Sequence, residues 1–183
     1  PTSRPIAAIP AAAPASQTLF LTATRTASPD VQVHFQNGYD LTEAGKYQES
    51  IEEYSKTIAI NPEYPYAYNN RGVAYLRTNQ FDQAIKDFNK AIKVNPDDYK
   101  TFANRGLAYE ALGSLDMALS DFKKAVDLYP QSSEAATNLF RIQNAIDAKN
   151  ALVVTATKVL VSPPSSTPPP TSSPTSLSPT PTA

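Results

Sequence analysis

One sequence pattern occurs three times, at a constant spacing, in the middle of the chain, and it limits what the chain can fold into. The units cover residues 31–64, 65–98 and 99–132. Gly38, Gly72 and Gly106 stand at the same place in successive units. Three more places repeat with the glycines, and they hold Ser50, Ala84 and Ala118, then Tyr54, Phe88 and Phe122, then Pro62, Pro96 and Pro130. A fixed period of this length indicates a stack of similar units rather than a single central core.

Each unit contains the periodicity of two helices. In the second unit, Tyr68, Gly72 and Tyr75 lie on one face of a helix predicted over residues 66–78. The helix after it has a stripe of small and apolar residues at spacings of three and four. The stripe consists of Phe81, Ala84, Ile85, Phe88, Ala91 and Ile92. Asn-Pro pairs at 61–62 and 95–96 end the second helices, because the residue before proline is pushed out of the α region.

These residues resemble the tetratricopeptide repeat (TPR) family, with three repeats and a C-terminal capping helix over residues 133–150. The Asn-Arg-Gly sequences at 70–72 and 104–106 resemble a common prokaryotic variant of the repeat. The resemblance implies an all-α solenoid that binds proteins and is not an enzyme. For the Asn-Arg-Gly sequences, we favour hydrogen bonding and packing between repeats over contact with a ligand.

In this family the first helix of each repeat lines a concave groove. The resemblance assigns nine residues of the chain to it: Phe35, Tyr39, Glu43, Asn69, Val73, Arg77, Lys100, Leu107 and Glu110. Some members clamp a C-terminal carboxylate there with Lys, Asn and Arg. Asn70 and Lys100 match two places of that clamp. Phe35 and Tyr39 stand where the clamp requires Lys and Asn, which argues against it.

The two ends of the chain differ in composition from the repeats. Residues 1–30 form an arm rich in Pro, Ala and Thr, and residues 162–183 form a tail of Pro, Ser and Thr that favours extended polyproline II conformations. Such a tail is typical of a linker or of an O-glycosylated stalk. The glycosylation hypothesis gives five candidate acceptors: Thr167, Thr171, Thr175, Thr180 and Thr182.

Two short segments next to the repeats, 18–26 and 151–161, resemble each other and alternate in the manner of strands. The candidate assembly residues are Leu19, Phe20, Leu21, Thr22 and Thr24 in the first segment, and Leu152, Val153, Val154, Thr155 and Thr157 in the second. Three alternatives stay open. The strands pair between molecules in a head-to-tail filament, they pair within one molecule, or the similarity is chance and both segments are linkers.

Composition argues against several classes of function. The net charge of −1, with both signs interleaved, disfavours nucleic acid as a partner. No apolar run reaches the roughly 20 residues of a membrane span. The chain has one histidine, His34, and no cysteine, so no catalytic triad or metal cluster can be assembled. We therefore expect no catalytic, cofactor-binding or metal-binding residues, and we interpret His34 as a packing residue.

Two hypotheses for the function remain. In the first, which we favour, the chain is a structural subunit of a secreted prokaryotic homopolymer, extracellular or at the cell surface, with glycans on its tails. Because the chain begins at Pro1 rather than at methionine, we expect that a leader has been removed. In the second hypothesis, the chain is a monomeric adaptor whose concave groove binds a peptide of a partner protein.

Overall fold

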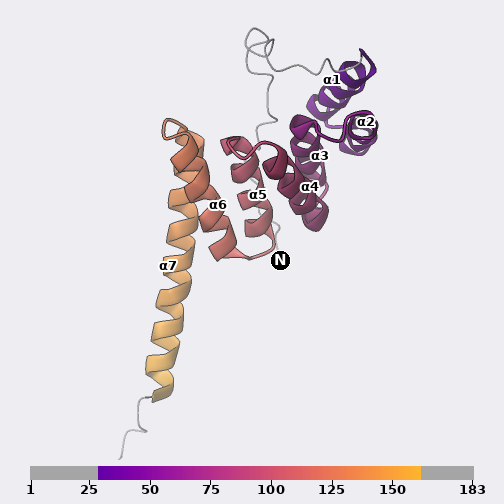
Figure 1. Cartoon of the computed structure of the whole chain (residues 1–183). Coiled ribbons are helices and arrows are strands. Elements are labelled where there is room, and N and C mark those ends of the chain that lie inside the picture. Colours follow the sequence, from indigo (N-terminus) through magenta and orange to yellow (C-terminus); the bar gives the residue numbers. More distant parts are fainter. Residues whose placement is uncertain (1–28, 162–183) are drawn as a thin grey trace, which may run out of the picture. The chain divides into compact units, whose positions relative to one another are not determined.

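The computed structural model describes residues 29–161, with side chains up to residue 153. All regular secondary structure in this range is helical, as predicted for the repeats (Figure 1). The helices are α1 (Pro29–Glu43), α2 (Tyr47–Ile60), α3 (Pro65–Arg77), α4 (Phe81–Val94), α5 (Tyr99–Ala111), α6 (Leu115–Leu128) and α7 (Ser133–Val161). The first six form three pairs, α1/α2, α3/α4 and α5/α6, one for each repeat of the sequence.

Each helical pair is held close at a glycine of its first helix. This glycine lies against an aromatic ring that is fully buried. A Cβ atom at this position would lie only 2.6 to 2.8 Å from a ring carbon. The contacts are Gly38 with Tyr54, Gly72 with Phe88, and Gly106 with Phe122. Because protein interiors are close-packed, any larger residue would push the two helices apart.

The turns and helix ends follow from local sequence. The turn inside each pair needs a left-handed residue, and Gly45, Asn79 and Gly113 have φ values of 73°, 60° and 74° there. α2 and α4 each end two residues before a proline, and their C-caps, Asn61 and Asn95, are extended. This confirms the prediction that the Asn-Pro pairs end the second helices, since the residue before proline is disfavoured in the α region.

The first and second helices of the repeats form separate layers. α1 contacts α3 and α3 contacts α5, whereas α2, α4 and α6 make no such contacts with one another. The second helices are linked to the next repeat instead, through contacts of α2 with α3 and of α4 with α5. We call α1, α3 and α5 the inner layer, because these first helices of successive repeats contact each other directly.

The helix α7 begins like the first helix of a further repeat. Ala135 and Ile142 are buried, and Ile142 belongs to the core cluster that contains Leu107 and Phe122. Phe140 stands where the repeat pattern, continued past Gly106, would place its next glycine, and it is 70% exposed. The repeats and α7 up to Lys149 form one compact unit, and a second unit begins at Asn150.

The predicted strand over 151–161 is wrong, and so is the predicted end of the capping helix at residue 150, because α7 continues to Val161. The chain contains no proline or glycine between Pro130 and Pro163 that could end the helix. The β-branched residues lower helix propensity by less than about 0.7 kcal/mol each. An existing helix gains one hydrogen bond for each added residue, so it extends through such a segment.

Candidate functional site

The nine residues assigned to the groove all lie on α1, α3 and α5, the helices of the inner layer. Their exposure divides them into three groups. The buried residues are Phe35, Asn69, Val73 and Leu107. The half-buried residues are Tyr39, Arg77, Lys100 and Glu110, and Glu43 is exposed. Val73 and Leu107 pack in the core with Phe88, so they set the spacing of the layer rather than provide surface for a ligand.

Three aromatic side chains form a row where α1 meets the start of α3. We call Phe35, Tyr64 and Tyr66 the aromatic cluster. Phe35 and Tyr64 meet edge to face with 5.2 Å between ring centroids, and Tyr64 and Tyr66 are 5.8 Å apart. Both separations suit attractive ring pairs. Phe35 is buried and the two tyrosines are half-buried, so the cluster joins an anchored ring to accessible aromatic surface.

Tyr64 and Tyr66 were not among the site residues predicted from the sequence. A signal for Tyr66 was present, since it has the same place in the second repeat as Lys100, which was assigned to the groove, has in the third. Burial raises the pKa of both tyrosines, so their hydroxyls stay neutral near pH 7. The aromatic cluster is therefore an uncharged surface, unlike the cationic clamp of some members of the family.

Buried side-chain amides connect α3 to α5. Asn69 Oδ1 accepts hydrogen bonds from Thr101 Oγ1 at 3.2 Å and from Asn104 Nδ2 at 3.1 Å. Asn69 Nδ2 donates to Asn70 Oδ1 at 3.2 Å. Asn70 is 1% exposed, and its Nδ2 has no hydrogen-bond partner among residues 29–153. An unpaired buried donor costs about 1–3 kcal/mol. Because the Asn70 side chain is buried, a ligand does not reach this donor, and the group that interacts with the amide is the Tyr54 hydroxyl.

The Tyr54 side chain lies between the aromatic cluster and the Asn70 amide and contacts both. The Tyr54 ring packs on Phe35 with 5.8 Å between centroids, and its hydroxyl is 3.3 Å from Thr42 Oγ1. Burial raises the pKa of Tyr54 to about 12, against smaller opposite effects of Thr42 and Asn70. The Asn70 amide is therefore near enough to the Tyr54 oxygen to lower the pKa of Tyr54, although Nδ2 makes no hydrogen bond of normal geometry with that hydroxyl.

The charged groups of the inner layer are only partly paired. Glu110 forms an ion pair with Arg141 of α7. Lys100 forms no ion pair with any residue in the described part of the chain, and its charge partly offsets the burial that raises the pKa of Glu134. Lys100 is therefore a cation that could meet an acceptor group of a ligand.

Two arginines of the Asn-Arg-Gly sequences join neighbouring repeats. Arg71 donates from Nε and Nη2 to the two carboxylate oxygens of Asp87, at 2.7 and 2.8 Å, and from Nη1 to Ser55 Oγ at 2.9 Å. Equivalent contacts in the third repeat join Arg105 to Asp121 and Asn89. The bonds to Ser55 and Asn89 confirm the predicted contacts between repeats, whereas the bonds to Asp87 and Asp121 lie within one repeat and were not predicted.

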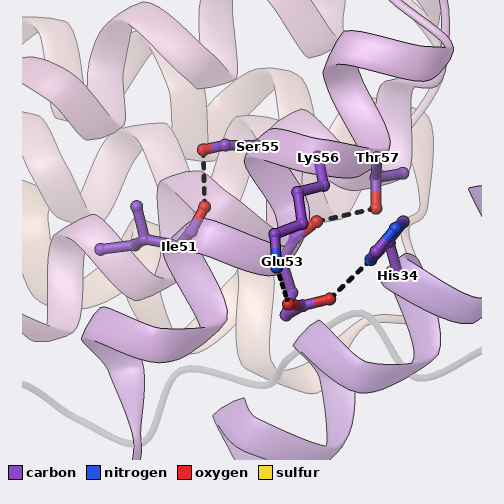
Figure 2. Close-up of polar contacts among 6 residues, drawn as sticks. All are labelled: His34, Ile51, Glu53, Ser55, Lys56 and Thr57. Atoms are coloured by element: carbon purple, nitrogen blue, oxygen red, sulfur yellow. Dashed lines mark hydrogen bonds and ion pairs between the residues drawn. The ribbon is translucent and has the colours of Figure 1, made fainter.

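The single histidine links the two helices of the first repeat (Figure 2). His34 Nδ1 lies 2.8 Å from Glu53 Oε2, and Lys56 Nζ donates to Glu53 Oε1 at 2.6 Å. Lys56, and after it His34, lower the pKa of the Glu53 carboxyl. Glu53 has the same place in the first repeat as Asp87 has in the second, so His34 takes the role that arginine has in the other repeats. This contact explains His34 as a structural residue.

Other predicted functional residues lie away from the inner layer or outside the described residues. Leu152, Val153, Val154, Thr155 and Thr157 belong to the helix α7, so they cannot pair as a strand with another segment. The first candidate strand, 18–26, and the five candidate threonines of the tail fall outside residues 29–161. Residues 29–161 contain no helix suited to spanning a membrane and no acidic or histidine cluster suited to a metal ion.

Comparisons with known proteins agree with the repeat structure. The family model described as "Tetratricopeptide repeat" matches residues 65–98 and 99–132, and a second model, "TPR repeat", matches residues 38–79. Among solved structures, the first TPR domain of Spaghetti (RPAP3) bound to the HSP90 peptide SRMEEVD is 32% identical, with a TM-score of 0.63. That match covers 64% of this chain and 94% of that domain.

Two further structures are similar. The first TPR domain of human RPAP3 is 32% identical with a TM-score of 0.64, and the match covers 66% of this chain and 95% of that one. The TPR domain of OM64 from Arabidopsis is 27% identical with a TM-score of 0.62, over 63% of this chain and 96% of that one. A comparison with curated protein sequences found no match. The family models, the solved structures and the three helical pairs agree, and the chain belongs to the tetratricopeptide repeat family.

Proposed function

We propose that this protein is a peptide-binding adaptor whose inner layer receives an extended segment of a partner protein. The observation that carries the proposal is the aromatic cluster, whose two tyrosines stay half-buried where the first helices α1 and α3 meet. The TPR domain of Spaghetti, similar over most of its length, is bound to a peptide of HSP90, and the second TPR domain of human RPAP3 is in complex with an HSP70 peptide.

The chemistry of the inner layer favours a different peptide from those two. Both peptides end in the acidic sequence EEVD. Here the buried Phe35 and the half-buried Tyr39 stand where a carboxylate clamp requires a cation and an amide, and Lys100 forms no ion pair with a carboxylate of the described residues. Removing a cation from the site weakens the attraction for a carboxylate terminus and leaves aromatic packing and hydrogen bonds as the main sources of affinity.

A phage-displayed library of random peptides, selected on the full-length protein, tests this proposal. We expect the selected peptides to bind the wild type and to bind the Tyr39→Ser/Lys100→Glu variant at least about tenfold more weakly, since this is about 1.4 kcal/mol in binding free energy. Lys93→Glu, on the exposed face of α4 and so outside the inner layer, is the matched control and should not change the affinity. Peptides that bind both variants like the wild type would contradict the proposal.

A further inference from the structure

The first repeat has a neighbouring repeat on one side only. Val33 on α1 is 55% exposed, whereas Ala67 and Thr101, at the same place in the next two repeats, are 0% and 1% exposed. In those repeats the preceding second helix packs on the first helix, as α2 does on α3 and α4 does on α5. Stacked repeats gain stability from each neighbour, and a helix with few partners opens locally at a low free energy. The stability of α1 therefore depends mainly on its contacts with α2.

The contact between α1 and α2 lacks the arginine that the other two repeats use. Asn37 has the place in the first repeat that Arg71 has in the second, and its side chain is exposed. His34 Nδ1 lies 2.8 Å from Glu53 Oε2 instead, while Lys56 of α2 binds the other carboxylate oxygen (Figure 2). Because α1 contains no arginine or lysine, His34 is the one side chain of this helix that can bring a positive charge to α2.

This difference makes the link in the first repeat sensitive to protons. A guanidinium stays charged at physiological pH, whereas imidazoles change charge between about pH 5 and pH 8. The protonated His34 ring forms an ion pair with Glu53, and the neutral ring keeps at most a hydrogen bond from Nδ1. The two side chains are 30% and 16% exposed, so water and salt screen the pair only in part.

The other ionisable side chains on α1 and on the helices packed against it, α2 and α3, are of types that ordinarily titrate outside this pH range. Besides Glu53, they are Asp30, Asp40, Glu43, Glu49, Glu52, Lys56, Arg71, Arg77, Tyr39, Tyr47, Tyr54, Tyr66, Tyr68 and Tyr75. His34 is the single histidine of the chain. A change in the packing of the first repeat between about pH 5 and pH 8 therefore reports on the charge of His34.

We propose that protonation of His34 holds α1 on α2, so that the first repeat is packed more firmly in mildly acidic than in mildly basic solution. The stabilisation is present while the ring is protonated and is lost as rising pH removes the proton. Phe35 follows His34 on α1 and packs on Tyr64, so local opening of α1 also separates the rings of the aromatic cluster. The inference goes beyond the proposed function and does not depend on it, because it concerns the packing of two helices.

Amide hydrogen exchange of the full-length protein, followed by NMR at about pH 5.5 and pH 7.5, tests the inference. After correction for the intrinsic exchange rates, we expect the protection factors of α1 amides to be about two- to fivefold lower at the higher pH, as for loss of a partly exposed ion pair. Amides of α5 and α6 are the internal reference, and their protection should not change between the two pH values.

Two variants assign the effect to the charge of His34. His34→Gln should remove the pH dependence, with α1 protected at both pH values as weakly as in the wild type at the higher pH. Asn37→Arg supplies the arginine of the other repeats and should also remove it, with strong protection at both pH values. Glu49→Gln breaks the exposed pair with Lys46 in the same repeat, so it is the matched control and should keep the pH dependence. Protection of α1 that does not change with pH in the wild type would overturn the inference, and so would a pH dependence that either of the first two variants retains.

Discussion

At the scale of single residues, the first repeat pairs its acidic residue with different side chains from those used in the other two repeats. Its acidic residue, Glu53, is in register with Asp87 and Asp121, which are bound by arginines. Glu53 has His34 and Lys56 as partners instead. The result is a link between α1 and α2 that depends on the ionised carboxylate, and its strength should therefore change with pH.

We expect Glu53→Gln to lower the free energy of unfolding at pH 7 and to have a smaller effect near pH 3. Lys56 and His34 hold the pKa of Glu53 below its ordinary value in the folded protein. A carboxyl with a lowered folded pKa stabilises the fold above its unfolded pKa of about 4.3, and this contribution is lost as pH falls through the folded pKa.

Urea denaturation of the wild type and the variant at both pH values measures this difference. Glu52→Gln, at the exposed neighbouring position, is the control for loss of a charge alone. If the Glu53→Gln effect were the same at pH 7 and pH 3, the contacts of Glu53 would not be electrostatic in origin.

At the scale of helices, arginines on the first helix of a repeat decide how the repeats are joined. Arg71 on α3 reaches Asp87 on α4 and Ser55 on α2, so one side chain connects three helices. Its guanidinium also lies over the Tyr68 and Tyr75 rings, 5.9 and 5.8 Å from their centroids. The planar fork of arginine can make these contacts together, whereas lysine cannot.

We expect Arg71→Ala to lower the free energy of unfolding by about 3 kcal/mol, because it leaves the mostly buried Asp87 carboxylate without its partner. Glu63→Ala breaks the exposed pair with Lys90 and should cost less than about 1 kcal/mol. Urea denaturation of the two variants provides the comparison. Equal effects would mean that the buried Asp87 pair stabilises the fold no more than an exposed ion pair does.

At the scale of the whole chain, the second and third repeats share a core cluster that extends into α7, whereas Phe35 and Tyr54 of the first repeat belong to a separate cluster. Ile142 is fully buried in the cluster that includes Val73 of the second repeat and Leu107 of the third. Stacked repeats obtain much of their stability from such interfaces between neighbours. The N-terminal half of α7 is therefore part of the folding unit, and a cavity in it should weaken the repeats that it covers.

We expect Ile142→Ala to lower the free energy of unfolding by about 2–5 kcal/mol, as for other large-to-small changes in a core. Phe140→Ala is the matched control on the same helix turn, and because Phe140 is 70% exposed its effect should stay within about 0.5 kcal/mol. Chemical denaturation followed by circular dichroism measures both. A larger effect of Phe140→Ala would show that its ring is covered in solution.

The sequence predicted the fold well where the information is local and periodic. The register of the repeats places Gly72 and Phe88 in contact, and the prolines mark the ends of α2 and α4. The end of α7 was predicted wrongly. The β-branched residues of 151–161 were interpreted as a strand, but they follow an existing helix, and a helix can extend through them. The contact of His34 with Glu53 and the place of Tyr66 in the cluster depend on packing between separate helices, which a periodic pattern does not reveal.

The exposed ring at position 140 has a consequence for how such a chain can change in length. Unequal recombination between similar repeats adds or removes whole units of a gene. A new unit inserted before Ser133 would keep every glycine opposite an aromatic ring, as at Gly106 and Phe122. A unit added after Ser133 would face a phenylalanine where a closely packed helix requires glycine. Whole repeats can therefore be inserted before α7, whereas a helix packed closely against α7 at Phe140 would clash with its ring.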